Sequence, residues 1–199
     1  MLDAMATADR ILDAAERFVQ TRGFNGFSYA DIASELDVTK ASLHYHFATK
    51  GDLGRALIVR YREVFVRLLS EIDDETKRAT EKLARYVALY RAVLSDDRMC
   101  LCGMVAAEYA TLPKAMQEEI RRFFSVNEEW LTSVIAGGVR AGDLDLRGGA
   151  ALDAARLLIG ALEGAMLVAR TYKSVDRFDA AARRLLEDLA PAKRRRRAS

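Results

Sequence analysis

Three hydroxyl residues near the N-terminus, Ser28, Thr39 and Thr49, each stand directly before a segment of helical character. Ser28 and Thr49 are followed three positions later by an aspartate, Asp31 and Asp52, which is typical of a capping box. A capping side chain accepts a hydrogen bond from a backbone N–H that has no partner inside the helix, so it fixes where the helix begins. These three starts predict two short helices joined by a tight turn, and a longer helix after them.

An amphipathic helix precedes these elements. Its apolar residues recur at helical spacing with charged residues off that stripe: Ile11, Ala14, Ala15, Phe18 and Val19. Gly23 is placed to end this helix. A short helix, a turn of three or four residues and a second short helix form a helix-turn-helix, whose second helix enters the DNA major groove.

The rest of the chain also favours helices. It contains only two prolines, while Ala, Leu, Glu and Arg cluster in long blocks. Helical blocks are expected at 75–94, 99–111, 113–141, 150–172 and 175–189. The predicted fold is therefore all-α, with a three-helix helix-turn-helix domain over 1–50, a connecting helix over 50–70, a helical bundle over 71–190, and a basic tail over 191–199.

Charge and composition exclude several classes of protein. The formal net charge is only +2, and the run Lys193–Arg197 alone contributes five positive charges. The longest uncharged stretch, Trp130–Val139, is about half of what a membrane-spanning helix needs. The N-terminus shows no basic segment leading into an apolar one, so no secretory signal is expected and a cytoplasmic location is predicted.

No chemistry of catalysis is visible in the sequence. The two cysteines stand two residues apart, both histidines lie within one short segment, and neither a phosphate-binding glycine loop nor a metal-ligand spacing occurs. We therefore expect no enzymatic activity, no cofactor and no metal.

The third predicted helix carries the groups that read DNA. No acidic residue occurs from Val38 to Gly51, although about one residue in seven of the chain is Asp or Glu. Within this window stand several hydrogen-bonding side chains that suit phosphates or base edges: Thr39, Lys40, Ser42, His44, Tyr45 and His46. The alternative for each alone is an ordinary surface or core residue; together they favour DNA binding.

Residues 10–61 resemble the DNA-binding region of the TetR family of bacterial transcriptional regulators. The resemblance runs through 10–15, Gly23-Phe24, 28–33 and 38–50. It implies that the segment 40–46 reads the groove, including Ala41, and that Ser28, Tyr29 and Lys50 hold phosphates. It also implies a homodimer on a palindromic double-stranded operator, acting as a repressor that a small-molecule or reactive effector releases. A helical scaffold or adaptor without specific DNA binding is the alternative.

The sequence departs from the family pattern at three positions. Asp37 stands where glycine is usual before the second short helix, His44 where tyrosine is more common, and Gly51 where an acid is usual. If position 37 needs a left-handed backbone, aspartate tolerates it better than most residues do.

The resemblance implies that the bundle over 71–190 serves dimerisation and ligand binding, although the sequence of this half is less diagnostic of the family. Its apolar segment after Gly149 resembles the family's dimer-forming region, and the expected interface residues are Leu158, Leu162, Ala165, Met166, Leu185 and Leu189. The expected effector pocket draws on residues of the central helices: Tyr86, Tyr90, Cys100, Met104, Tyr109, Phe123 and Trp130. Core packing is the alternative for each of these, and the sequence does not identify the effector.

One segment of this half suggests specific chemistry. Residues 98–108 resemble the branch of the family that includes the electrophile sensor NemR, in which a cysteine of this segment reacts, and Cys100 is the matching position. A thiol in the first turn of a helix and near Arg98 would have its thiolate favoured. The alternative is a buried thiol that behaves as a small apolar group.

Overall fold

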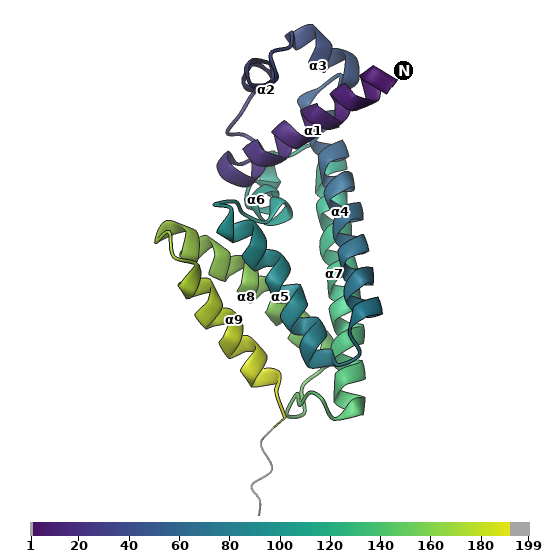
Figure 1. Cartoon of the computed structure of the whole chain (residues 1–199), viewed down its shortest axis with the longest axis vertical. Coiled ribbons are helices and arrows are strands. Elements are labelled where there is room, and N and C mark those ends of the chain that lie inside the picture. The colour runs from purple at the N-terminus through teal and green to yellow at the C-terminus, as the bar shows by residue number, and fades with distance from the viewer. Residues whose placement is uncertain (1, 192–199) are drawn as a thin grey trace, which may run out of the picture. The chain divides into compact units, whose positions relative to one another are not determined.

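The computed structural model describes residues 2–191, and Figure 1 shows their arrangement. The elements are α1 (Leu2–Arg22), α2 (Tyr29–Leu36), α3 (Lys40–His46), α4 (Lys50–Glu75), α5 (Ala79–Ser95), α6 (Leu101–Ala107), the 3₁₀ helix η1 (Tyr109–Thr111), α7 (Lys114–Ala141), α8 (Ala151–Thr171) and α9 (Val175–Leu189). No strand occurs within residues 2–191, which confirms the all-α prediction. The basic run at 193–197 lies outside this range. In the same range, no helix is long and apolar enough to cross a membrane.

The predicted helix starts are confirmed in the N-terminal region. The backbone N–H and the hydroxyl of Ser28 both donate to Asp31 Oδ2, each at 2.7 Å, at the start of α2. Thr39 Oγ1 accepts from the N–H of Ser42 at 3.2 Å, which caps α3. At the start of α4, the Thr49 N–H donates to Asp52 Oδ2 at 3.0 Å, and Thr49 Oγ1 accepts from the N–H of Asp52 at 3.1 Å.

The turn between α2 and α3 uses a left-handed residue. Asp37 has φ 53° and ψ 50°, and the N–H of Val38 returns to the Ala33 carbonyl at 3.0 Å. Glycine usually fills such a position, but the short polar side chain of aspartate tolerates it. The turn is therefore made without the glycine that the family pattern usually has there.

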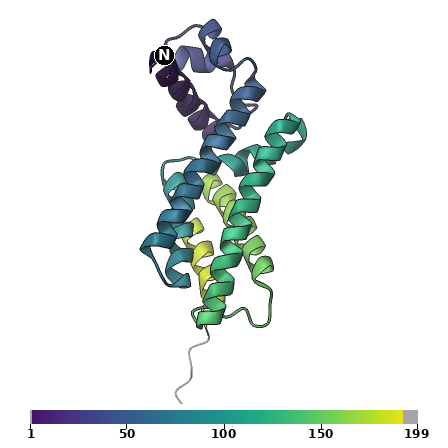
Figure 2. The same ribbon diagram turned by 90° about the vertical axis from the view of Figure 1, so that its right-hand side faces the viewer.

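The chain divides into two compact units. The first is Met1–Arg67 with Val93–Ser125, and the second is Leu68–Ala92 with Val126–Ser199. The first unit thus includes α6 and η1, whereas the boundary predicted from the sequence at residue 71 assigned them to the C-terminal bundle. Within it, α1, α2 and α3 gather at the N-terminal end of α4 (Figures 1 and 2). Within the second unit, α8 and α9 pack side by side as a helical hairpin.

The core of the first unit is built on the apolar stripe of α1, whose five predicted members are all buried. Phe18 stacks on Phe27 with ring centroids 5.5 Å apart, and Phe24 meets Phe27 edge-on at 6.0 Å. Leu43 anchors α3 to this core and is fully buried. The one buried residue of α3 therefore holds the helix by one side and leaves its opposite side to solvent.

Candidate nucleic-acid interface

The exposed side of α3 carries most of the groups expected to meet DNA. Lys40, Ala41, His44 and Tyr45 are exposed. Since each residue of a helix advances about 100°, Ala41 and Tyr45 lie opposite Leu43, and Lys40 and His44 lie on the flank between them and Leu43. Thr39 is exposed just before them, whereas Ser42 and His46 are half-buried at the edge of this side. Tyr45 is 81% exposed, the largest exposure among the large hydrophobic residues that the structure describes. A phenol held clear of its own domain on a helix is well suited to contact a partner surface.

His44 is oriented by the loop that follows α3. Its Nδ1 lies 3.0 Å from the Ala48 carbonyl oxygen, and its ring lies 4.8 Å from the ring of Tyr29. A carbonyl only accepts, so Nδ1 carries the proton in this contact, and in the tautomer with a single proton Nε2 is an acceptor. An acceptor at this place matches the exocyclic amino group of adenine or cytosine in the major groove.

Tyr29 and Lys50, which were expected to hold phosphates, bond within the domain. The Tyr29 hydroxyl donates to the Phe47 carbonyl at 2.8 Å, and burial, with a smaller effect from Asp52, raises the pKa of Tyr29 to about 12. Lys50 Nζ donates to the carbonyls of Phe24, at 2.5 Å, and of Phe27. Its ammonium lies over both phenyl rings, and burial lowers the pKa of Lys50.

Ser28 is the exposed member of the expected phosphate set, with its hydroxyl donated to Asp31. The phosphate contacts of Ser28, Tyr29 and Lys50 stay predictions. The structure shows a structural role for Tyr29 and Lys50, because each of them bonds one segment of the N-terminal helix-turn-helix domain to another. Sequence inspection missed this role, since nothing near either residue in the sequence marks its partners.

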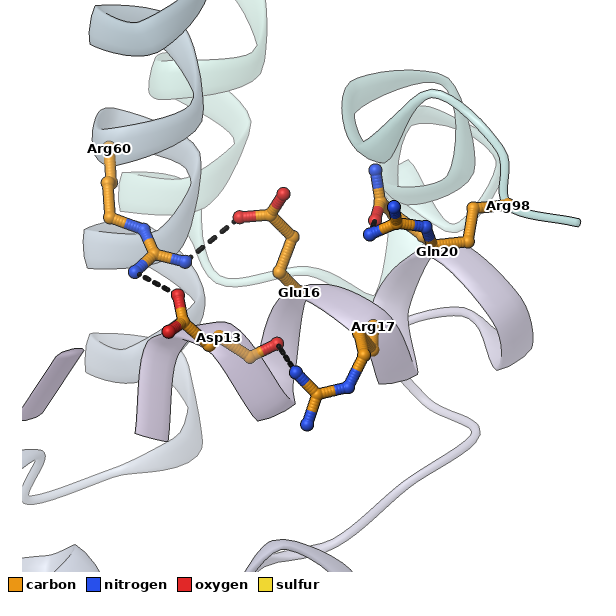
Figure 3. Close-up of polar contacts among 6 residues, drawn as sticks. All are labelled: Asp13, Glu16, Arg17, Gln20, Arg60 and Arg98. Atoms are coloured by element: carbon orange, nitrogen blue, oxygen red, sulfur yellow. Dashed lines mark hydrogen bonds and ion pairs between the residues drawn. The ribbon is translucent and has the colours of Figure 1, made fainter. Parts of the chain in front are cut away.

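A polar network, also missed by sequence inspection, fixes α1 to its neighbours. Arg60 of α4 donates to Asp13 Oδ1 at 2.8 Å and to Glu16 Oε2 at 2.9 Å, as Figure 3 shows. Also on α1, the side-chain oxygen of Gln20 accepts a hydrogen bond from the guanidinium of Arg98 at 3.4 Å. The sequence shows only that acidic residues flank the apolar stripe of α1. This position indicates that their side chains lie outside the core, but it does not indicate that they bind Arg60.

Replacing Tyr29 with phenylalanine is expected to lower the free energy of unfolding at pH 7 by about 1 kcal/mol, because the hydrogen bond to Phe47 is lost. Since the folded-state pKa lies above the ordinary 10.0, the stability contributed by the neutral phenol is complete below pH 10 and is lost as the pH rises towards about 12. The difference between parent and variant therefore shrinks over that range. Urea unfolding at pH 7 to 11.5 measures it, with Tyr45→Phe as the exposed control, and a constant difference contradicts the assignment.

The effector-pocket residues fall into the two units. In the second unit, the Tyr86 hydroxyl donates to Asn127 Oδ1 at 3.0 Å and lies 3.1 Å from the hydroxyl of Tyr90. The Tyr86 ring stacks on Trp130, whose indole N–H donates to Asp73 at 2.9 Å. Trp130 also lines a cavity of about 340 Å³ together with Asp73, Lys77, Lys82 and Ser133.

In the first unit, Cys100 is the residue before α6 and is 2% exposed. Its sulfur lies 4.0 Å from the Tyr61 hydroxyl, which donates to it. Phe123 is fully buried, Met104 is half-buried, and the hydroxyl of Tyr109 accepts from Arg121 at 2.6 Å. Among the described residues, no group of three or more His, Cys, Asp or Glu side chains is placed to hold a metal.

The predicted dimer stripe needs a correction. Leu158, Leu162 and Met166 are buried in the chain's own core, and Ala165, Leu185 and Leu189 are half-buried. The most exposed apolar residues of α8 are instead Leu157 at 65%, Leu167 at 52% and Val168 at 52%, on a face that also carries the exposed Gly160 and Gly164. Leu158, Leu162 and Met166 were misplaced because α8 is apolar on two sides, and periodicity alone does not tell which side the chain itself covers. The dimer contacts of Ala165, Leu185 and Leu189 stay predictions.

Comparison with known proteins supports the assignment of a helix-turn-helix domain. The family model for bacterial regulatory proteins of the tetR family matches residues 11–57. A TetR-family transcriptional regulator from Agrobacterium tumefaciens has a crystal structure that superposes with a TM-score of 0.90 at 32% identity, covering 94% of this chain and 99% of that one. Reduced NemR of E. coli superposes with a TM-score of 0.80 over 94% of this chain and 99% of its own, and at 21% identity this likeness shows the fold alone.

Curated relatives match over a shorter span. IcaR of Staphylococcus epidermidis, a negative transcriptional regulator of the icaADBC biofilm operon, is 23% identical over 113 residues, which cover 57% of this chain and 58% of IcaR. For the first curated relatives, the matched region covers 63%, 58% and 36% of their lengths, less than two thirds in each case. These relatives are regulators of transcription, in line with the expectation that this chain is not an enzyme.

Proposed function

This chain belongs to the TetR family of bacterial transcriptional regulators, and on that premise we propose that it represses transcription by binding a palindromic operator as a homodimer. The observation that carries the proposal is the exposed, acid-free side of α3, on which Lys40, His44 and the 81% exposed Tyr45 stand together. Thr39 and Ser42 flank this side and supply hydroxyls. Repression is favoured because IcaR is named a negative regulator.

A dimer follows from the geometry of palindromic DNA. Two recognition helices must meet successive major grooves about 34 Å apart, which one α3 does not do alone. We assign the interface to the exposed stripe of α8, defined as Leu157, Gly160, Gly164, Leu167 and Val168. Two glycines among three large apolar residues let the backbone of a second helix approach while the side chains around them exclude water.

Release by an effector completes the proposed cycle. A small molecule that binds one conformation of the dimer better than another shifts the population away from the operator-bound form. The buried hydroxyls of Tyr86 and Tyr90, together with the buried Asn127, offer polar groups for such a ligand inside a largely apolar core. Reaction of Cys100 with an electrophile requires its surroundings to open first, because the thiol is 2% exposed.

The proposed function implies a location in the bacterial cytoplasm, where the operator DNA lies.

Selection of bound DNA from a random pool tests the proposal. The purified protein is expected to enrich an inverted repeat whose half-sites lie about one helical turn apart. Affinity for that repeat should exceed affinity for random DNA of equal length by about a thousandfold or more at the same salt concentration. Failure to enrich any sequence would support the scaffold or adaptor alternative instead.

Replacing Lys40 with glutamine is expected to weaken binding to the selected and to random DNA by about the same factor, because an exposed lysine in the first turn of α3 acts mainly on phosphates. The slope of log affinity against log salt should fall by about 0.9 for each protomer. Fluorescence anisotropy at several salt concentrations measures both quantities, with the exposed Lys77→Gln as control. A loss confined to the selected sequence would show that Lys40 reads a base.

A further inference from the structure

The loop between α1 and α2, residues 23–28, is held on one side by α4. Lys50, the first residue of α4, donates from Nζ to the carbonyls of Phe24 and Phe27. The ammonium also lies 4.6 Å and 4.3 Å from the centroids of these two rings. The carbonyl groups and the aromatic rings of the loop are thus bound to α4.

The backbone N–H groups of the same loop are bound by Glu108, which ends α6 and precedes η1. Its Oε2 accepts from the backbone N–H of Phe24 at 2.8 Å and of Asn25 at 3.1 Å. The Asn25 side-chain amide also donates to Thr111 Oγ1 of η1 at 2.9 Å. A carboxylate that receives two backbone N–H groups makes charge-assisted hydrogen bonds, which are about twice as strong as neutral ones.

Gly23 makes room for this carboxylate. Its φ is +85°, in the left-handed region, and a Cβ placed on it would lie 2.7 Å from Glu108 Oε1. That separation is shorter than real Cβ contacts, so a side chain at position 23 would push the Glu108 carboxylate away from the place it occupies here. Gly23 therefore serves the contact with Glu108 as well as ending α1.

The segment leading into α6 contacts α1 as well. The N–H of Met99 donates to the Gln20 carbonyl at 3.1 Å, close to where Arg98 meets the Gln20 side chain (Figure 3). We define residues 98–111 as the α6–η1 segment. It therefore bonds to the last turn of α1 through Gln20 and to the α1–α2 loop through Glu108 and Thr111.

We propose that Glu108 is a positioning residue through which the α6–η1 segment controls operator binding. The loop leads directly into α2, and α2 carries α3 through the tight turn at Asp37. While Glu108 holds the amides of Phe24 and Asn25, the loop fixes the orientation in which α3 meets the groove. A shift of the α6–η1 segment that withdraws the carboxylate releases the loop and lowers specific affinity. This inference rests on the proposed function.

The charges on the two sides of the loop are linked. Burial lowers the pKa of Lys50, and the negative charge of Glu108 opposes that effect. Neutralising Glu108 is therefore expected to lower the pKa of Lys50 further. An NMR titration of the Lys50 side chain in the parent and in Glu108→Gln measures this change and so tests whether the two charges interact.

Glu108→Gln is the principal test, since it keeps the size of the side chain and removes its charge. Glu118→Gln, an exposed glutamate of α7 in the same unit, is the matched control. In the full-length Glu108→Gln protein, amide exchange at Phe24 and Asn25 should become faster. Affinity for the selected operator should fall roughly 10-fold, while affinity for random DNA of equal length stays within about twofold of the parent.

A merely stabilising role predicts a different result. Loss of folded protein lowers binding to operator and random DNA by the same factor, so the ratio of the two affinities separates positioning from stability. An unchanged ratio, with faster exchange at Phe24 and Asn25, overturns the proposal. A parent protein that selects no operator overturns the proposed function itself, and this inference with it.

Thr111→Val provides a second variant if Glu108→Gln folds poorly. It removes the bond from Asn25 and the bond that Thr111 Oγ1 donates to the Glu108 carbonyl at 2.9 Å, and it keeps the Glu108 side chain itself. The ratio of operator to random-DNA affinity should fall in the same direction by about two- to threefold. If a folded Thr111→Val protein has the parent's ratio of operator affinity to random-DNA affinity, the α6–η1 segment does not control operator binding through this loop.

Discussion

Replacing Leu167 with aspartate is expected to leave the chain folded, to separate the dimer into monomers and to lower operator affinity by about 100-fold or more. Leu167 is 52% exposed in the single chain, so the charge does not enter its core. In the dimer the same side chain would be buried against the partner, and an unpaired carboxylate there loses its hydration. The loss of operator affinity follows because the second half-site no longer binds at the effective concentration that the dimer provides.

Val139→Asp is the matched control for this prediction. Val139 lies on α7 in the same unit and is 40% exposed, but it is outside the stripe of α8. Sedimentation velocity at micromolar protein should show a monomer for Leu167→Asp and a dimer for the control. If Leu167→Asp remains a dimer with parental operator affinity, the interface lies elsewhere.

Replacing Tyr45 with alanine should lower affinity for the selected operator by about 10-fold per half-site, or roughly 100-fold for the dimer, because one well-placed base contact contributes about 1–3 kcal/mol of discrimination. The midpoint of thermal unfolding should stay near that of the parent, since the side chain is 81% exposed. Affinity for random DNA should change little.

Tyr45→Phe separates the two parts of this contact. It keeps the ring and removes the hydroxyl, so a loss shared by both variants belongs to the hydrogen bond and a loss found only in alanine belongs to the ring. Repeating the DNA selection with Tyr45→Ala should relax or change the preferred base at one position of each half-site. An unaltered site bound with parental affinity would show that Tyr45 does not read the groove.

Helix starts were predictable from the sequence because their determinants are local. Ser28 and Asp31 are three residues apart and bond to each other wherever the surrounding chain goes. The same holds for Thr49 and Asp52. The order of short and long helices follows from these starts, and with it the helix-turn-helix.

Two features depended on segments that are distant in sequence. Lys50 turns to carbonyls more than 20 residues earlier, and Glu108 reaches amides more than 80 residues earlier. A flexible lysine reads as a surface charge until the segment that surrounds it is known. The outward and inward sides of α8 were likewise indistinguishable, because Leu158 and Leu167 belong to equally apolar stripes and only the packing of the chain decides between them.

The two stripes of α8 also bear on how such regulators diverge. Bacteria that carry several related repressors need each to pair with its own copy, and discrimination among similar partners comes from shape and charge that reject the wrong one. On α8 the side chains that hold the fold, such as Leu162, are distinct from those that face outward, such as Leu157. At the interface proposed above, mutations on the outward stripe therefore change the choice of partner while the residues that hold the monomer together stay the same.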